Sequence, residues 1–307
     1  YLKNEKIPGF FTENTLLLRD NTISLITGVK VDNHNTFGLF VTPRALLKYD
    51  ITEFTTARIS AGTGWRTINL FSENTNLMAS SRDIVITETL NPEKAINYGA
   101  NLTHKIYSTN IETQLTFDFY GTEFINQIFP DYDSNPTKAY LSNYTGKSVS
   151  NGFQAEIGLE FFQKVGAKIA YNFLDVYRIV NDKKLVLPFN AEHRITSTFS
   201  YHPLSKKWHV DMNVHWYGKQ RLAATKNNPI EYQLPETSKP YVVANIQFTK
   251  KWKQLEVYVG CENIFDFHQK QAILSWQNPF GPYFDTSSVW GPTKGREFYV
   301  GLRFKVL

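Results

Sequence analysis

The sequence has a single cysteine, no long apolar run and no cluster of basic residues. One cysteine, Cys261, excludes both an internal disulfide framework and a cysteine zinc site. Cys261 continues an alternating apolar series with Leu255, Val257 and Val259, so we interpret it as a small hydrophobic side chain. No stretch approaches the ~18 consecutive apolar residues of a transmembrane helix, which excludes a helical membrane protein.

Two further absences narrow the class of protein. The first residues, Tyr1 to Lys6, lack the basic and then apolar pattern of a signal peptide, so we expect a mature chain, a cytoplasmic chain or part of a longer one. The net charge of +5 is spread along the 307 residues. Nucleic-acid binding requires a basic stripe or a known nucleic-acid-binding fold, and the sequence offers neither.

Strict alternation of apolar and polar residues is the dominant pattern, and it is clearest at the end of the chain. Residues 297–306 place five apolar side chains on one face and polar or small residues on the other. The apolar series is Phe298, Val300, Leu302, Phe304 and Val306. Side chains of a strand point to alternate faces. The apolar face of such a strand belongs either to a soluble core or to the lipid side of a membrane barrel.

The same pattern recurs in about thirteen segments of ~9–11 residues, the length of a tilted membrane strand. Short turns follow the odd-numbered segments. Long connections follow the fourth, sixth, eighth, tenth and twelfth segments. We expect irregular structure in these connections, over about 63–94, 125–149, 177–192, 218–240 and 265–295. Short turns on one rim and long loops on the other predict an all-β, transmembrane antiparallel β-barrel.

The odd strand number carries a second inference. Bacterial single-chain barrels have an even number of strands, and an unpaired strand edge is not viable in lipid. We therefore expect this chain to be the C-terminal part of a longer barrel. It should begin on the long-loop side.

Several segments resemble the barrel of TonB-dependent outer-membrane receptors. They are Phe71–Asn74 after Gly64–Arg66, then Leu90–Gly99, Asp118–Tyr120, Glu262–Asp266 and the closing Gly295–Phe304. The resemblance implies a 22-stranded barrel with a plugged lumen, located in the outer membrane of a Gram-negative bacterium. Residues 1–307 would be the C-terminal portion of this one domain, about 13 strands, with no plug domain in the chain. The terminal Leu307 departs from the aromatic residue on which such barrels often end.

The implied function is active uptake of a scarce ligand, such as a siderophore or other metal chelate, haem, cobalamin or an oligomer. The resemblance implies an inner-membrane TonB energy-coupling complex as partner, acting through a plug. Outer-membrane lipid, lipopolysaccharide, the ligand and a possible surface lipoprotein complete the expected partners, with no nucleic acid. A passive porin or structural barrel, and a soluble carbohydrate-binding module, remain as alternatives.

Candidate site residues fall into two groups, and we expect no enzyme activity, cofactor or metal site. Loops carry function in such scaffolds, and an aromatic loop can stack on a ring of the ligand. The loop candidates for ligand binding are Trp65, Arg66, Trp276, Asn278, Phe280, Tyr283, Phe284 and Trp290. The polar residues expected to face the lumen are Arg44, Arg58, Asp118, Glu156, His209, Asp211, His215 and Arg303. His209 and His215 lie six residues apart, ~20 Å along a strand, so they cannot share one ion.

Overall fold

The computed structural model describes residues 4–305 and is dominated by one large antiparallel sheet. Val306 and Leu307, the last residues of the predicted closing strand, lie outside this range. The main sheet consists of β1 (Gly9–Leu18), β2 (Ile23–His34), β3 (Gly38–Thr52), β4 (Thr55–Arg66), β6 (Glu93–Tyr107), β7 (Ile111–Ile125), β10 (Ser148–Phe161), β11 (Val165–Val180), β12 (Lys183–Val186), β13 (His193–Tyr201), β14 (Trp208–Tyr217), β15 (Tyr241–Lys251), β16 (Leu255–Glu262) and β17 (Glu297–Phe304).

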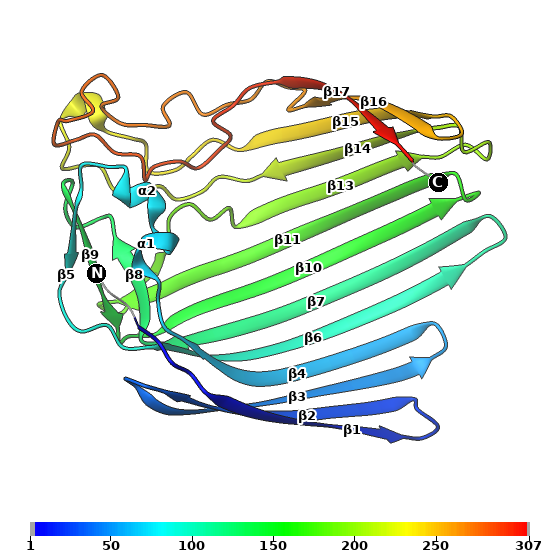
Figure 1. Ribbon diagram of the computed structural model, residues 1–307, viewed down its shortest axis with the longest axis horizontal. Coiled ribbons are helices and arrows are strands. Elements are labelled where there is room, and N and C mark those ends of the chain that lie inside the picture. Colours follow the sequence, from blue (N-terminus) through cyan, green and yellow to red (C-terminus); the bar gives the residue numbers. More distant parts are fainter. Residues whose placement is uncertain (1–3, 306–307) are drawn as a thin grey trace.

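Thirteen of the described strands pair in chain order, each antiparallel to the next, and the short β12 pairs with β11 alone. This confirms the thirteen strands predicted from alternation. Figure 1 shows a curved sheet in which β1 and β17 form the two edges. The short turns gather at one end of the strands and the long connections at the other, as the sequence predicts.

The pairing register keeps the apolar and polar faces separate across the sheet. Phe153 lies between Phe119 and Phe173 of the two neighbouring strands. The next residue, Gln154, lies between Asp118 and Asn172. A slip of one residue would exchange the faces, so the alternation in each strand fixes the register with its neighbours. We refer to these two sides as the apolar face and the polar face.

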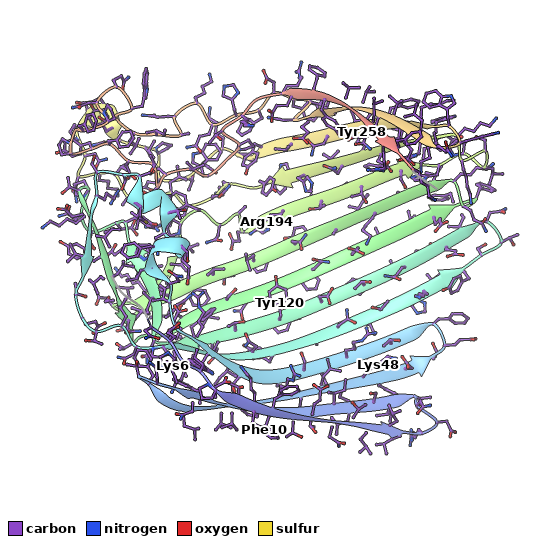
Figure 2. The ribbon with its side chains drawn as sticks, viewed as in Figure 1. Lys6, Phe10, Lys48, Tyr120, Arg194 and Tyr258 are labelled. Carbon is purple, nitrogen blue, oxygen red and sulfur yellow. The ribbon has the colours of Figure 1, made fainter. Side chains whose placement is uncertain are left out.

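Among residues 4–305, no protein layer covers the apolar face. Phe10, Phe298 and Val300 are more than two-thirds exposed. Figure 2 shows Phe10 at the margin of the molecule and Tyr120 and Arg194 over the middle strands. At the short-turn end, the Trp208 ring contacts Tyr201 and Phe248. Aromatic side chains at strand ends are typical of the interface between membrane and water.

Pro43 lies within β3, a position where proline is unexpected because it has no N–H to donate. Its partner on the β2 side is Val29. On the other side, the pairing of β3 with β4 ends at Arg44 and Gly62, immediately before Pro43 would be required. Pro43 therefore lies just beyond the hydrogen-bonded pairing of β3 with β4, where its missing N–H is not needed.

Three stretches expected to be irregular contain strands or α-helices. Residues 63–94 include the end of β4, then α1 (Leu70–Glu73), α2 (Thr75–Met78) and β5 (Asp83–Ile86). Residues 125–149 include β8 (Gln127–Asp131) and β9 (Lys138–Tyr144). The stretch 177–192 holds the end of β11 and β12. These elements have four to seven residues each, apart from the ends of β4 and β11, which is too short for a clear periodicity, and β5 pairs with β9, a partner far away in the sequence. Among the described helices, none is long and apolar enough to cross a membrane.

Candidate ligand-binding site

The long connections do not project separately but pack together at one end of the strands (Figure 1). We call this assembly the cap and define it as residues 67–92, 126–147, 181–192, 218–240 and 263–296. Strand β5, from the first of these loops, pairs in parallel with β9 from the second, and β8 completes a small sheet. A small core of Ile68, Leu70, Ile128 and Leu141 lies beneath it. The cap is therefore a folded unit.

Arg82 links three segments of the cap. Its Nε donates to Asp285 Oδ2 at 2.9 Å, and the two side chains are 1% and 4% exposed. Its Nη1 donates to the carbonyl oxygen of Asn135 at 2.9 Å, with longer contacts to those of Tyr132 and Lys138. A buried guanidinium is tolerated only when its donors are used. Here one arginine joins residues 67–92 to 126–147 and to 263–296.

Asp285 and Tyr132 complete the surroundings of this ion pair. The second oxygen of Asp285, Oδ1, accepts hydrogen bonds from the backbone N–H and the hydroxyl of Ser287. The Arg82 guanidinium also lies 5.8 Å from the centre of the Tyr132 ring. Burial, together with the negative charge of Asp285, raises the pKa of the Tyr132 hydroxyl to about 12. The hydroxyl is therefore neutral across the physiological range.

A second contact holds residues 218–240 in the cap. Arg221 Nη2 donates to Asp133 Oδ2 at 2.5 Å, and the backbone N–H of Ala224 donates to Asp133 Oδ1 at 2.8 Å. Gln220 Nε2 donates to the carbonyl oxygen of Trp290. Residues 126–147 therefore bind two arginine side chains, Arg82 from residues 67–92 and Arg221 from residues 218–240. Sequence reasoning assigned neither arginine, because no periodic pattern marks residues that meet across loops.

Glu93 anchors the cap to the rim of the sheet. Its side chain is 5% exposed and accepts from Arg66 Nε at 2.5 Å and from the backbone N–H of Ile128 at 2.6 Å. Arg66 Nη1 also pairs with Glu73 of α1 at 3.0 Å. These contacts pair the Arg66 guanidinium with two carboxylates, although its side chain is 57% exposed. Arg66 is the last residue of β4, whereas irregular structure was expected from about residue 63.

Trp65 is likewise part of β4 and is engaged at the rim. Its indole stacks on Phe40, with the ring centroids 3.8 Å apart and the planes 8° from parallel. Its Nε1 donates to Asp32 Oδ2 at 3.1 Å. Trp65 and Arg66 therefore contact residues of β2, β3, α1 and β6.

The six candidates from residues 263–296 separate into exposed and packed side chains. Phe280 is 98% exposed and Trp276 is 64% exposed, and Asn278 is exposed beside them. The N–H of Gly281 donates to the carbonyl oxygen of Asn278, which closes the turn that carries Phe280.

The other three candidates pack within the cap. The Tyr283 ring contacts Tyr232, and the carbonyl oxygen of Phe284 accepts from the Ser81 N–H. Trp290 lies against Tyr241 and Phe267. Trp276, Asn278 and Phe280 are thus the members of the group that remain free to meet a ligand from outside.

The register places all eight polar candidates on the polar face. Each of the eight has a side-chain partner. The pairs are Arg44 with Glu13, Arg58 with Asn101, Asp118 with Asn101, Glu156 with Lys168, Asp211 with His202 and His209, His215 with Thr196, and Arg303 with Glu256. No group of three or more metal-ligating side chains among residues 4–305 could hold an ion. The polar face is thus lined by ion pairs and by hydrogen-bonded polar side chains.

A cavity of about 980 Å³ lies against the polar face at the short-turn end. Its lining includes Glu156, Glu160, Lys164, Lys168, His202 and His209. Near the loop end of the same face, the Tyr217 ring stacks on Tyr241 with centroids 4.8 Å apart. Arg194 lies opposite Tyr217 in the register. Sequence reasoning did not single out this arginine and tyrosine group, although each member occupies a polar-face position of its strand.

Comparison with known proteins identifies the architecture. The family model described as "TonB dependent receptor-like, beta-barrel" matches residues 3–264. No curated protein matches the sequence. A variant of the ferric enterobactin receptor PfeA from Pseudomonas aeruginosa, in complex with enterobactin, has a similar structure (TM-score 0.69, 17% identity, covering 97% of this chain and 45% of that one).

Two further solved structures are similar. One is the siderophore receptor PirA from Acinetobacter baumannii (TM-score 0.68, 17% identity, 98% of this chain and 46% of that one). The other is the FpvAI–pyocin S2 complex (TM-score 0.65, 17% identity, 98% and 37%). At these identities the likeness shows a shared fold. The chain spans less than half the length of each of these structures.

Proposed function

The chain belongs to the TonB-dependent receptor β-barrel family, and we propose that it forms part of a receptor that takes up a scarce ligand across the outer membrane of a Gram-negative bacterium. The match of the family model to residues 3–264 carries this proposal. The expected ligand is a metal chelate such as a siderophore, haem or cobalamin, or an oligomer. Several structural neighbours are named as siderophore receptors, which favours an iron chelate. No enzyme activity is expected of a receptor of this family.

We propose that residues 1–307 supply the C-terminal strands of one plugged, 22-stranded barrel. Two observations support this. The chain spans less than half of its structural neighbours, and both edges of the described sheet, β1 and β17, have unpaired backbone groups. In lipid these groups must be paired. The remaining strands and the plug would lie elsewhere in the receptor, and the TonB complex would act through the plug.

In this arrangement the apolar face meets lipid, with lipopolysaccharide around the loop end. The polar face, with Arg44, Arg58, Asp118, Glu156, His209, Asp211, His215 and Arg303, lines the lumen. Its paired charges would contact water and the plug, and the cavity beside Glu156 and Lys168 is where part of the plug would lie. A surface lipoprotein is a further possible partner on the cap side.

We propose that the ligand first meets Trp276, Asn278 and Phe280, because these side chains are exposed on the cap. Tyr283, Phe284 and Trp290 would support them from within. Trp65 and Arg66 would hold the rim that carries the cap. Below the cap, Arg194 and Tyr217 offer a positive charge and an aromatic ring to an anionic, ring-containing ligand, and the buried Tyr241 supports the Tyr217 ring from behind.

Purification of the full-length receptor tests this proposal against a passive porin. We expect the protein in the outer-membrane fraction, extractable only with detergent, and without open-channel conductance in planar bilayers, because the plug fills the lumen. Free ion conduction would favour the porin. Extraction as a monomer without detergent would contradict a membrane location.

A further inference from the structure

A lysine lies on the apolar face at the short-turn end of the sheet. Lys250 is the direct partner of Trp208 in the pairing of β14 with β15, and of Val257 in the pairing of β15 with β16. Direct partners in an antiparallel pair have their side chains on the same side of the sheet. Trp208 and Val257 belong to the apolar face, so the Lys250 side chain leaves the sheet on that face as well.

No carboxylate neutralises Lys250 in the described part of the chain. The half-buried side chain forms no ion pair or hydrogen bond there, and its Nζ lies 6.0 Å from the centre of the Trp252 ring. Glu256, the acidic residue at this end of β16, is on the polar face, where Lys251 and Arg303 bind it at 3.2 and 2.8 Å. An ammonium group in apolar surroundings is costly without an anion. We therefore expect the anion to come from outside the chain.

Two indole rings flank this ammonium group, and their N–H donors are unused. Trp208 is the partner of Lys250 on β14, and Trp252 begins the turn that its own N–H closes with the carbonyl oxygen of Leu255. Among the described residues, neither indole Nε1 donates a hydrogen bond to the protein, and Trp252 is 54% exposed. The indole N–H of a tryptophan at a membrane interface ordinarily finds an acceptor. Lys250, Trp208 and Trp252 thus offer three hydrogen-bond donors to one ligand.

Two adjacent turns bring further positive charge to this place. The backbone N–H of Lys251 donates to the carbonyl oxygen of Lys207 at 2.7 Å, which joins the turn before β14 to the end of β15. Lys207 and Lys253 are exposed, and neither pairs with a carboxylate in the described chain. These lysines are more than forty residues apart in the sequence, and the pairing of β14 with β15 brings their turns together.

The other short turns of this rim are less basic. The turns after β1 and β3 contain the acidic residues Asp20 and Glu53, and the turn after β6 contains no charged residue. The turn after β10 contains Lys164, which lines the cavity on the polar face. The turns after β13 and β15 contain lysines and no acidic residue. They are therefore the most basic part of the described rim.

We propose that Lys250, Trp208 and Trp252 bind the headgroup of a phospholipid with a net negative charge. The short turns of an outer-membrane barrel lie on the periplasmic side, where phospholipids form the leaflet. Lys250 pairs with the phosphate, the two indole N–H groups donate to its oxygens, and Lys207 and Lys253 favour an anionic headgroup over a zwitterionic one. This inference rests on the proposed function for the membrane location and orientation of the barrel, and it involves no uptake.

The test measures the phospholipid that the full-length receptor retains in an uncharged detergent. Native mass spectrometry compares the complexes formed with dioleoylphosphatidylglycerol and with dioleoylphosphatidylcholine at equal concentrations. We expect the parent receptor to retain about fivefold more of the anionic lipid, equivalent to about 1 kcal/mol. Lys250→Gln should lower this preference at least threefold, and Lys250→Arg should preserve it. Equal retention of the two lipids by the parent, or an unchanged preference in Lys250→Gln, would overturn the proposal.

The matched control removes the same charge from the same rim but from the polar face. Lys164→Gln should leave lipid retention unchanged, because Lys164 lies in the turn after β10 and lines the polar-face cavity. An equal loss in Lys164→Gln would show that the preference follows total charge, and would overturn the site. Trp252→Phe keeps the aromatic ring and removes the N–H donor, so it should lower retention of the anionic lipid about twofold. It also tests the site if Lys250→Gln fails to fold.

Inorganic phosphate distinguishes a lipid site from a site for any small anion. Phosphate in large excess should not displace dioleoylphosphatidylglycerol, because the acyl chains contribute to binding along the apolar face. Displacement would overturn the assignment to a lipid. A receptor that retains the anionic lipid through Lys250 but takes up no ligand would contradict the proposed function and leave the lipid site supported. Uptake without a lipid preference would have the opposite meaning.

Discussion

The ring of Tyr120 lies over Gly152 of the neighbouring strand, in the space that a Cβ atom at position 152 would occupy. The two residues are direct partners in the pairing of β7 with β10, on the polar face. The same arrangement recurs on the polar face where Tyr299 covers Gly260 and Tyr258 covers Gly301. A tyrosine that fits over a glycine fixes the register at that point, because a slip of one residue would bring a side chain beneath the ring.

Gly152→Ala should therefore destabilise the barrel by about 1–3 kcal/mol, since the Tyr120 ring must move from its place. Gly158→Ala is the matched control, because position 158 lies on the same face of the same strand with open space around it. The measurement is the urea unfolding midpoint of the full-length receptor in lipid. In a Tyr120→Ala background the cost of Gly152→Ala should largely disappear; an unchanged cost there would contradict the assignment.

Arginine substitutions at Phe153 and at its neighbour Gln154 test which face of the sheet meets lipid. Phe153→Arg places a charge on the apolar face and should cost about 2–4 kcal/mol in a bilayer. Gln154→Arg places the same charge on the polar face, between Asp118 and Asn172, and should cost little. Unfolding of each variant in lipid vesicles supplies the comparison. Equal costs for the two neighbours would mean that the faces are assigned wrongly.

Alanine variants of Trp65 and Trp276 distinguish a side chain that stabilises the rim of the sheet from one that is free to contact a ligand. Trp65→Ala removes the stack of this half-buried side chain on Phe40 and its hydrogen bond to Asp32, so stability should fall by about 1–3 kcal/mol. Trp276→Ala removes an exposed side chain, and stability should change by no more than about 0.5 kcal/mol. Thermal unfolding of the two variants checks this. A stability loss confined to Trp276→Ala would reverse the two assignments.

The pH at which the Tyr132 hydroxyl loses its proton should show whether the cap is folded around it. Its pKa is raised from the ordinary value of 10.0 to about 12, chiefly by burial. The folded cap therefore prefers the neutral hydroxyl: this contribution to stability is complete below pH 10 and is lost as the pH rises through about 12. The difference in tyrosinate absorbance between the parent receptor and Tyr132→Phe isolates this group. A midpoint near 10 would show that Tyr132 is exposed.

The strands could be predicted from the sequence because each one carries its own alternation of apolar and polar residues. Phe153 and Gln154 illustrate why: the face of each side chain follows from its position in the strand, and the register then follows from its neighbours. Even Pro43, which argued against a central strand, lies where the pairing with β4 stops. Local pattern and tertiary structure agree for the thirteen strands that pair in chain order, whereas the short β12 lies in a stretch expected to be irregular.

The cap could not be predicted in the same way. Strand β5 has four residues, and its parallel pairing with β9 joins positions more than fifty residues apart. Arg82 and Asp285 are separated by 203 residues, and nothing near either one indicates the other. Trp65 and Arg66 were expected in an irregular stretch, whereas they belong to β4 and contact Phe40 and Glu93. Such contacts are decided by packing between loops and not by local sequence.

The most direct test of the receptor account is energy-dependent uptake by cells that carry the full-length protein. Radiolabelled ferric chelates, haem and cobalamin are each offered to cells with and without the receptor, before and after a protonophore abolishes the inner-membrane potential. We expect one of these probes to accumulate saturably only in receptor-bearing cells, and the protonophore to stop accumulation while binding at the surface persists. Accumulation that is unsaturable and insensitive to the protonophore would contradict active uptake and indicate a passive channel.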